Sequence, residues 1–166
     1  NGTDKHIIIP DYLFGENDIQ IKVVGITAGA FRNKNQIESV RIGKYVKNID
    51  QEAFIYTSRL TSVVIADDSR LEIIGASAFR YASLLQSINF PESLKTIGAN
   101  AFENTVLTTA DFGSNIDTIA ANAFRQTRLT RVSMPEDANL RIIGEFAFYN
   151  TQITSINFGD KLESIG

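Results

Sequence analysis

Hydrophobic residues recur along this chain at intervals far longer than the turn of a helix or the alternation of a strand. Six Ala-Phe pairs mark the recurrence, and successive phenylalanines lie 23, 25, 23, 22 and 24 residues apart. They are Phe31, Phe54, Phe79, Phe102, Phe124 and Phe148. An Ile lies five positions before each Phe, and a further aliphatic residue lies three positions before that Ile. Six copies in one order indicate an internal repeat.

Each repeat also carries a short hydrophobic module, L-x-x-V-x-I, that begins five or six residues after the Phe. Leu60, Val63 and Ile65 form one copy. The last two apolar positions alternate as in a strand with one buried face. A single unit cannot bury its apolar side chains, whereas stacked units cover one another. The repeat therefore predicts a solenoid of six coils, with parallel strands about 4.8 Å apart.

The Ala-Phe pair marks the place where each coil turns back with its backbone close to the core. We expect the small Ala to act as a spacer and the Phe to fill the width between layers. Thr recurs three residues after the Phe, and short hydroxyl side chains at a turn commonly bond to nearby backbone. These residues are Thr57, Thr105, Thr127 and Thr151, for which we predict a structural role.

The same register divides the 166 residues into parts of one predicted domain, 1–166. A half coil covers 3–10, a loop covers 11–22, six repeats cover 23–158, and the start of a seventh covers 159–166. Pro10, Pro91 and Pro135 each follow a strand module directly, where a missing N–H does least harm to the ladder. Because the seventh repeat lacks an Ala-Phe pair and solenoids normally end in polar caps, we expect either a fragment of a longer surface protein or an open end that another molecule covers.

Composition narrows the classes of partner. The formal net charge of -3 offers no basic field for phosphates, so we expect no nucleic-acid partner. No run approaches the roughly 18 apolar residues of a membrane-spanning helix, so we expect no direct membrane insertion in this segment. Because the chain has no Cys, it has no disulfide, no thiolate nucleophile and no Cys-based metal site.

The run I-G-x-x-A-F-x-x-T-x-L-x-x-I-x-F/M-P resembles the BspA-type leucine-rich repeat, and IIIPDYLFGENDIQIKVVGITAGAF resembles the opening that such domains often carry. Where many relatives have Cys after Ala-Phe, this chain has Thr, Ala or Lys34. The resemblance implies an α/β leucine-rich-repeat right-handed solenoid, with a parallel β-sheet on the concave face and short helical or 3₁₀ turns on the convex face. Members are mostly surface or secreted bacterial proteins, several associated with adhesion to host matrix proteins or other cells. No catalytic residues travel with the motif.

Strand alternation places the residues between the apolar positions on the concave surface. The side chains on that surface are mostly small and polar, so the surface is nearly flat, and we predict that it binds a ligand. The candidate ligand-binding residues are Arg41, Asn89, Asp111, Arg131, Ser133 and Asn157. Two repeats carry two extra residues after the strand module and place Asp67, Asp68, Glu136 and Asp137 along one edge. We expect this acidic edge either to select a basic partner or only to solvate longer loops.

Two enzymatic interpretations are weaker than a binding role. Asp4, His6 and Ser39 have the residue types of a nucleophilic triad, but no glycine elbow or oxyanion loop accompanies Ser39. A polysaccharide lyase would need clustered carboxylates, whereas Asp111 and Arg131 are diagonal neighbours that suit a surface ion pair. We therefore predict no catalytic residues, no cofactor and no metal site.

The sequence favours a non-enzymatic protein-recognition or adhesion module that binds through the concave sheet. By resemblance alone, we expect it to be extracellular or at the cell surface. The expected partner is a protein, such as a host extracellular-matrix or cell-surface protein, and a glycan is a second class. The alternatives are a carbohydrate-active parallel β-helix enzyme or accessory domain, and a rigid structural spacer.

Overall fold

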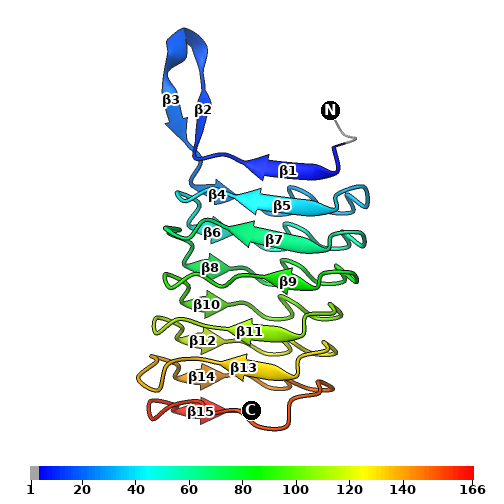
Figure 1. Ribbon diagram of the computed structural model, residues 1–166, viewed down its shortest axis with the longest axis vertical. Coiled ribbons are helices and arrows are strands. Elements are labelled where there is room, and N and C mark those ends of the chain that lie inside the picture. Colours follow the sequence, from blue (N-terminus) through cyan, green and yellow to red (C-terminus); the bar gives the residue numbers. More distant parts are fainter. Residues whose placement is uncertain (1–3) are drawn as a thin grey trace.

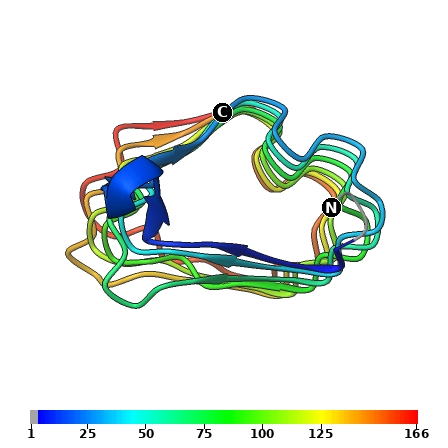
Figure 2. The same cartoon turned by 90° about the horizontal axis from the view of Figure 1, so that it is seen from above.

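The computed structural model describes residues 4–166, which form a solenoid with a hairpin projecting from its N-terminal end (Figure 1). The coils stack along one axis, and each contributes backbone to a front side and a rear side (Figures 1 and 2). The front side holds the L-x-x-V-x-I modules, and the rear side holds the Ile that precedes each Ala-Phe pair. The predicted solenoid with parallel strands is confirmed.

The front side consists of the strands formed by the half coil and by five of the six L-x-x-V-x-I modules, and the sixth module, at 153–158, forms no strand. The strands are β1 (His6–Ile9), β5 (Ser39–Ile42), β7 (Ser62–Ile65), β9 (Ser87–Ile88), β11 (Thr109–Asp111) and β13 (Arg131–Ser133). Neighbours pair in the register that the repeat predicts, so that Val40 stands opposite Val63. Strand β1 pairs with β5, β5 with β7 and β7 with β9, whereas β11 pairs with β13 in a separate sheet. The front sheet therefore breaks between β9 and β11.

A change in spacing coincides with this break. In the three coils before it, the module begins six residues after the Phe, as from Phe79 to Leu85. In the three coils after it, the interval is five residues, as from Phe102 to Leu107. We infer that the turn shortened by one residue shifts the following strand along its own axis at this break. Backbone donors and acceptors on the two sides of the break then no longer face one another.

The rear side is a second sheet that the sequence analysis does not predict. Its strands are β4 (Gly25–Ile26), β6 (Asn48–Ile49), β8 (Ile73–Ile74), β10 (Thr96–Ile97), β12 (Thr118–Ile119), β14 (Ile142–Ile143) and β15 (Ser164–Ile165). All seven pair in parallel without interruption, and each ends at the Ile of its repeat. Only three residues separate this Ile from the Ala of the Ala-Phe pair, which leaves no room for a helix of even two turns.

The six phenylalanines form one column inside the solenoid, as predicted. Neighbouring rings stack with centroids between 4.9 and 5.6 Å apart and planes within 8° of parallel. The four inner rings, Phe54, Phe79, Phe102 and Phe124, have no exposed surface. The column continues past the break in the front sheet, because the centroids of Phe79 and Phe102 lie 5.3 Å apart.

The turns beside the Phe column are tight turns rather than helices. Residues two before and two after the Phe adopt left-handed backbone, as Asn100 and Asn104 do around Phe102, with φ of 57° and 58°. Three of the predicted Thr hydroxyls donate to the carbonyl oxygen of the Phe in their own coil, which confirms their structural role. They are Thr57, Thr105 and Thr127, at 2.7, 2.9 and 2.9 Å. Within residues 4–166 the one 3₁₀ helix, η1 (Glu16–Asp18), lies outside the coils.

The segment 11–22, predicted to be a loop, is a hairpin, and the prediction is wrong in this respect. Strands β2 (Tyr12–Phe14) and β3 (Gln20–Lys22) pair antiparallel around η1 and project beyond the stack (Figure 1). At the tip, Asn17 and Asp18 have φ of 60° and 57°, a conformation that Asn and Asp tolerate. Two short β-prone segments on either side of Gly-Glu-Asn-Asp are a hairpin signal in the sequence.

Candidate functional site

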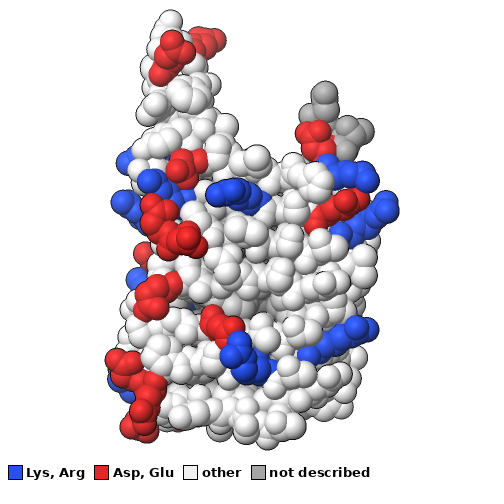
Figure 3. Space-filling view, viewed as in Figure 1, with Lys and Arg blue, Asp and Glu red and all other residues white. Residues whose placement is uncertain are grey.

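The front face presents the residues that the sequence analysis assigns to ligand binding. Charged side chains gather mainly along its two edges, and few interrupt its centre (Figure 3). Arg41 is exposed on β5 between Ile8 of β1 and Val64 of β7, which are also exposed. Within residues 4–166 no hydrogen bond or ion pair engages the Arg41 guanidinium. This cation is therefore available to a ligand.

A shallow hollow of about 580 Å³ opens in the front face where the sheet breaks. Its lining includes Val64, Ile88 and Phe90, together with the polar residues Asn89 and Asp111. Ile88 and Phe90 are 8% and 9% exposed, whereas Val64 is 51% exposed. The lining also includes Asp67, Ser87 and Thr109, so the hollow is a mixed polar and apolar surface whose exposed apolar part comes mainly from Val64.

The side chain of Asn89 is engaged beside this hollow. Its Oδ1 accepts a hydrogen bond from the backbone N–H of Ile65 at 2.7 Å, and its Nδ2 donates to the Ile65 carbonyl oxygen at 2.8 Å. The amide continues the ladder where β9 ends at Ile88. Asn89 therefore has a structural role, and only its second donor hydrogen and second lone pair remain for a ligand.

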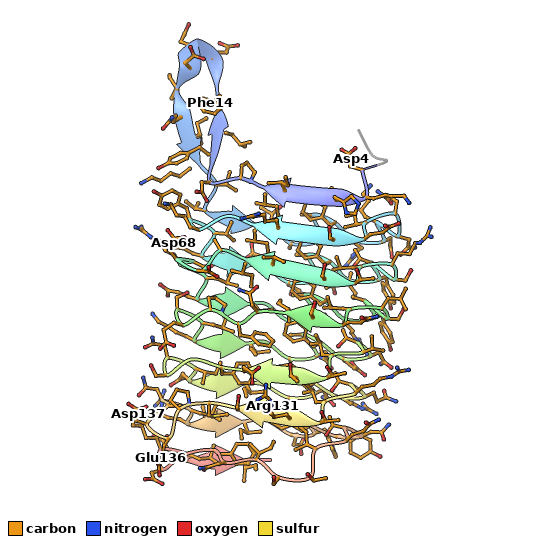
Figure 4. The ribbon with its side chains drawn as sticks, viewed as in Figure 1. Asp4, Phe14, Asp68, Arg131, Glu136 and Asp137 are labelled. Atoms are coloured by element: carbon orange, nitrogen blue, oxygen red, sulfur yellow. The ribbon has the colours of Figure 1, made fainter. Side chains whose placement is uncertain are left out.

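Asp111, Arg131 and Ser133 come together on β11 and β13, and Arg131 faces outward from the front side (Figure 4). Arg131 Nη2 lies 3.0 Å from Asp111 Oδ2, and Ser133 Oγ donates to Asp111 Oδ1. Because Arg131 stands opposite Thr109, the ion pair is diagonal, as predicted. The side chains of Arg131 and Asp111 are 62% and 51% exposed, so water screens their attraction. The pair places both signs of charge beside the hollow.

The six predicted residues do not form one site. Four of them gather around the break in the sheet, whereas Arg41 and Asn157 lie apart from it. Arg41 is on β5, three coils from β11. Asn157 lies in the sixth module, which forms no strand, and its Oδ1 accepts a hydrogen bond from the backbone N–H of Gly159 at 3.1 Å. The break, rather than the whole face, is the candidate site.

The predicted acidic edge exists as two separate pairs on one side of the stack (Figure 4). Its residues are Asp67, Asp68, Glu136 and Asp137. Asp68 Oδ2 lies 3.4 Å from Lys44 Nζ. Lys161 Nζ donates to the carbonyl oxygen of Asp137 at 2.7 Å and to Asn139 Oδ1 at 2.8 Å. Each acidic pair thus has a lysine of the same chain beside it, which weakens its attraction for a basic partner.

A column of alternating charge runs down the stack directly before the rear strands, and the sequence analysis misses it. Its members are Lys47, Glu72, Lys95, Asp117, Arg141 and Glu163. Ion pairs join Glu72 to Lys95 at 3.1 Å and Asp117 to Arg141 at 2.7 Å. Hydrogen bonds from Arg141 and then Thr118 hold the pKa of Asp117 below its ordinary value, and Asp117 raises the pKa of Arg141. The signal in the sequence was the residue two positions before each rear Ile, whose charge alternates between positive and negative from one coil to the next.

His6 and Ser39 stand opposite one another on β1 and β5, with His6 Nδ1 2.8 Å from Ser39 Oγ. They form a cross-strand pair on an open surface. Among residues 4–166 there is no group of three or more His, Cys, Asp or Glu side chains placed to hold a metal ion. The same residues include no helix long and apolar enough to cross a membrane. The front face offers a ligand hydrogen bonds, an ion pair and apolar contacts.

The fold and the open front face define a repeat protein of the solenoid class. Residues 7–70 and 47–166 match the family described as BspA type Leucine rich repeat region, with six copies. The chain belongs to this family. No curated protein matches the sequence closely enough to add a second line of comparison.

Solved structures share the fold at low sequence identity. A leucine rich cell surface protein from Faecalibacterium prausnitzii A2-165 matches with a TM-score of 0.70 and 22% identity, over 97% of this chain and 43% of that one. The T. pallidum leucine rich repeat protein TpLRR matches with a TM-score of 0.53 and 20% identity, over 80% and 70% of the two chains. The pneumococcal vaccine antigen PcpA matches with a TM-score of 0.53 and 24% identity, over 82% and 42%. This chain therefore spans less than half the length of the Faecalibacterium protein.

Proposed function

We propose that this chain is a non-enzymatic recognition module of a bacterial cell-surface protein and binds a protein ligand through its front face. Membership of the leucine-rich-repeat family supports a repeat module for protein interaction, and the cell-surface protein among its structural neighbours supports the location. Adhesion to a host extracellular-matrix or cell-surface protein is the specific role we propose.

The observation that carries the proposal is the hollow at the break in the front sheet. Val64 supplies most of the exposed apolar surface there, Asp67 and Asp111 line the hollow, and Arg131 lies beside it in an ion pair with Asp111. Protein interfaces combine an apolar centre with a polar rim in this way. The lining is also polar, with Asp67, Ser87, Asn89, Thr109 and Asp111, so a glycan is the second class of ligand, and family membership favours a protein.

Binding of purified extracellular-matrix proteins to the immobilised chain tests the proposal. Val64→Arg places a long cation over the hollow, and we expect it to weaken binding by about tenfold or more because the apolar contact is lost. Ile73→Arg is the matched control, since Ile73 is 42% exposed on the rear sheet and its replacement leaves the front face intact. Equal binding by the two variants would contradict a front-face site.

The two other functional classes give different results. A rigid spacer predicts that Val64→Arg and Arg131→Ala leave every binding measurement unchanged. A carbohydrate-active enzyme predicts that ultraviolet absorbance from new double bonds appears when the chain is incubated with a uronate polymer. Our proposal predicts no such absorbance and loss of protein binding in Val64→Arg.

A further inference from the structure

Three cations surround one aromatic ring where the hairpin meets the first coil. Lys22 Nζ lies 4.9 Å from the centroid of the Tyr45 ring, Lys44 Nζ lies 5.3 Å from it, and Arg70 Cζ lies 5.1 Å from it. Lys22 comes from β3, Lys44 from the turn after β5, and Arg70 from the longer turn after β7. Tyr45, Lys22, Lys44 and Arg70 are called the Tyr45 cluster below. Lys and Arg side chains gather at this edge, below the hairpin (Figure 3).

The positive charge of the Tyr45 cluster is only partly balanced by the chain itself. Asp68 pairs with Lys44 at 3.4 Å. The Oδ1 atom of Asp11 accepts a hydrogen bond from the backbone N–H of Lys44 at 2.7 Å and not from a side-chain cation. Within residues 4–166 no ion pair engages Lys22 or Arg70. Two exposed cations therefore remain beside one ring without a carboxylate partner.

The repeat pattern does not account for Lys44. The position of Lys44, two residues after the strand module, is acidic or Ser in every other coil. Those residues are Asp11, Asp67, Glu92, Ser114, Glu136 and Asp160. A chain of net charge -3 thus concentrates positive charge at a point where its own repeat elsewhere favours negative charge. Asp68 gives Lys44 an ion-pair partner within the chain, whereas Lys22 and Arg70 have none among residues 4–166, and a negatively charged ligand would supply one.

The hydroxyl of Tyr45 is affected by its hydrogen-bond partner and by the cations of the cluster. Tyr12 Oη donates a hydrogen bond to Tyr45 Oη at 3.0 Å, and the two rings meet edge to face at 5.2 Å. This hydrogen bond lowers the pKa of Tyr45, and Lys44, Lys22 and Arg70 lower it further. The same bond raises the pKa of Tyr12. An anion beside the Tyr45 hydroxyl would therefore meet a local surplus of positive charge.

We propose that the Tyr45 cluster binds the sulfate groups of a sulfated polysaccharide. Lys and Arg on three separate segments converge from different directions, which suits a compact anion with several acceptor oxygens. The site is open, and one exposed ion pair contributes about 1 kcal/mol or less, so a single sulfate would bind weakly. A polymer that carries many sulfates gains affinity by rebinding. The cluster lies on the edge of the coil, so this proposal does not depend on the front-face function.

Heparin is the probe for a direct test, in buffer of about 0.15 M NaCl where the screening length is close to 8 Å. The variant K22Q/K44Q/R70Q removes the three cations. We expect its heparin affinity to fall by about tenfold or more, since all three contacts are lost together. The matched control is K34Q/R59Q/R128Q, which removes the same charge from exposed positions outside the cluster. We expect the control to lose less than about threefold, through the general field alone.

Three further measurements separate the sources of anion. Hyaluronan carries carboxylates without sulfates, and we expect it to bind at least about tenfold more weakly than heparin. Vesicles that contain phosphatidylserine should not bind. Heparin should raise the pKa of Tyr45 towards its ordinary value, because a bound anion offsets the neighbouring cations. The change should be absent from the ultraviolet titration of Tyr45→Phe.

Several results would overturn the proposal. If the two triple variants lost the same heparin affinity, the net charge of the chain, and not the Tyr45 cluster, would account for the loss. Hyaluronan binding as tight as heparin would remove the assignment to sulfate, and vesicle capture without heparin binding would point to a lipid headgroup. Heparin binding with an unchanged Tyr45 titration would place the polymer elsewhere on the chain.

Discussion

The front and rear sides of this solenoid come from the same coils, yet they differ in continuity. The rear side forms one parallel sheet of seven strands, whereas the front side divides between β9 and β11. The Phe column lies between them and also runs without interruption. On the rear side the distance from the aliphatic residue to Ile and from Ile to Phe never changes. From Phe to the front module it changes from six residues to five at the break.

The difference shows how a repeat can keep its core constant while its surface varies. A fixed interval keeps donors and acceptors of successive coils opposite each other, so the ladder continues. The turn that varies leads into the front strands, and the hollow beside Asn89 lies where their ladder is interrupted. Variation is concentrated on the side that we propose binds a ligand.

The largest effect should follow from an insertion that breaks the constant interval. One Ala inserted between Asn100 and Ala101 moves Ala101 and Phe102 out of register with the coils on both sides. We expect a loss of about 5 kcal/mol or more, at least that of deleting one buried Phe. The free energy of unfolding from urea titration measures it, and a chain that does not fold is the extreme of the same result.

The control for this insertion is one Ala placed between Thr105 and Val106, within the variable turn. It restores the six-residue interval in the fourth coil, and we expect the break to move to between β11 and β13. The stability should change by about 1 kcal/mol or less, because surface turns tolerate insertion. Amide exchange of residues 109–111 reports the new pairing. Equal damage from both insertions would refute the contrast between the two sides.

The next largest effect concerns the Phe column itself. Phe102→Ala removes a ring with no exposed surface and leaves a cavity between Phe79 and Phe124. We expect a loss of about 3–5 kcal/mol in the free energy of unfolding. Phe148→Ala, at a partly exposed ring near the end of the column, should cost clearly less. A loss below about 1 kcal/mol for Phe102→Ala would contradict the central role of the column.

A smaller effect should come from the side chain that closes the front ladder. Asn89→Ala removes both hydrogen bonds to the Ile65 backbone and leaves that N–H and C=O facing the hollow. We expect a loss of about 1–2 kcal/mol in thermal or urea unfolding. Asn157→Ala is the control, because Asn157 is exposed and bonds only to a neighbouring turn. If the two variants lose the same stability, Asn89 does not support the sheet.

A comparable but slightly smaller effect is expected in the turn between the Phe column and the front side. Thr105→Val keeps the shape of the side chain and removes the buried hydroxyl that donates to the Phe102 carbonyl oxygen. The Phe102 carbonyl oxygen still accepts a hydrogen bond from the backbone N–H of residue 105, so we expect a loss of about 1 kcal/mol in the free energy of unfolding. Denaturant unfolding measures it. A stabilised Thr105→Val variant would show that the hydroxyl is dispensable.

The smallest effect should be found in the charge column beside the rear sheet. The pKa of Asp117 is lowered by Arg141 and Thr118, so its carboxylate stabilises the fold above the ordinary pKa. This contribution is lost as the pH falls through the lowered pKa. Asp117→Asn should therefore lower the melting temperature by about 1 °C at pH 7 and by less near pH 3. An equal difference at both pH values would mean that the charge of Asp117 is not involved.

Much of the fold follows from the sequence because the repeat restates it in every coil. The Phe column, the front strands and their register, and the Thr hydroxyl bonds each rest on several copies of one pattern. The diagonal pair of Asp111 and Arg131 follows from that register as well. The hairpin at residues 12–22 was missed because it occurs once and lies outside the repeat.

The sequence by itself therefore determined the coil, its core and the parallel direction of its strands, since periodic apolar positions have one way to cover each other. Tertiary structure alone decided that the rear Ile forms a second sheet, that the front sheet breaks at a hollow, and that the Lys44 side chain comes to the Tyr45 ring. These features depend on how neighbouring coils and the hairpin come together in space. Lys22, Tyr45 and Arg70, by contrast, share one position of the repeat, directly before its first aliphatic residue, so the register itself places them in successive coils.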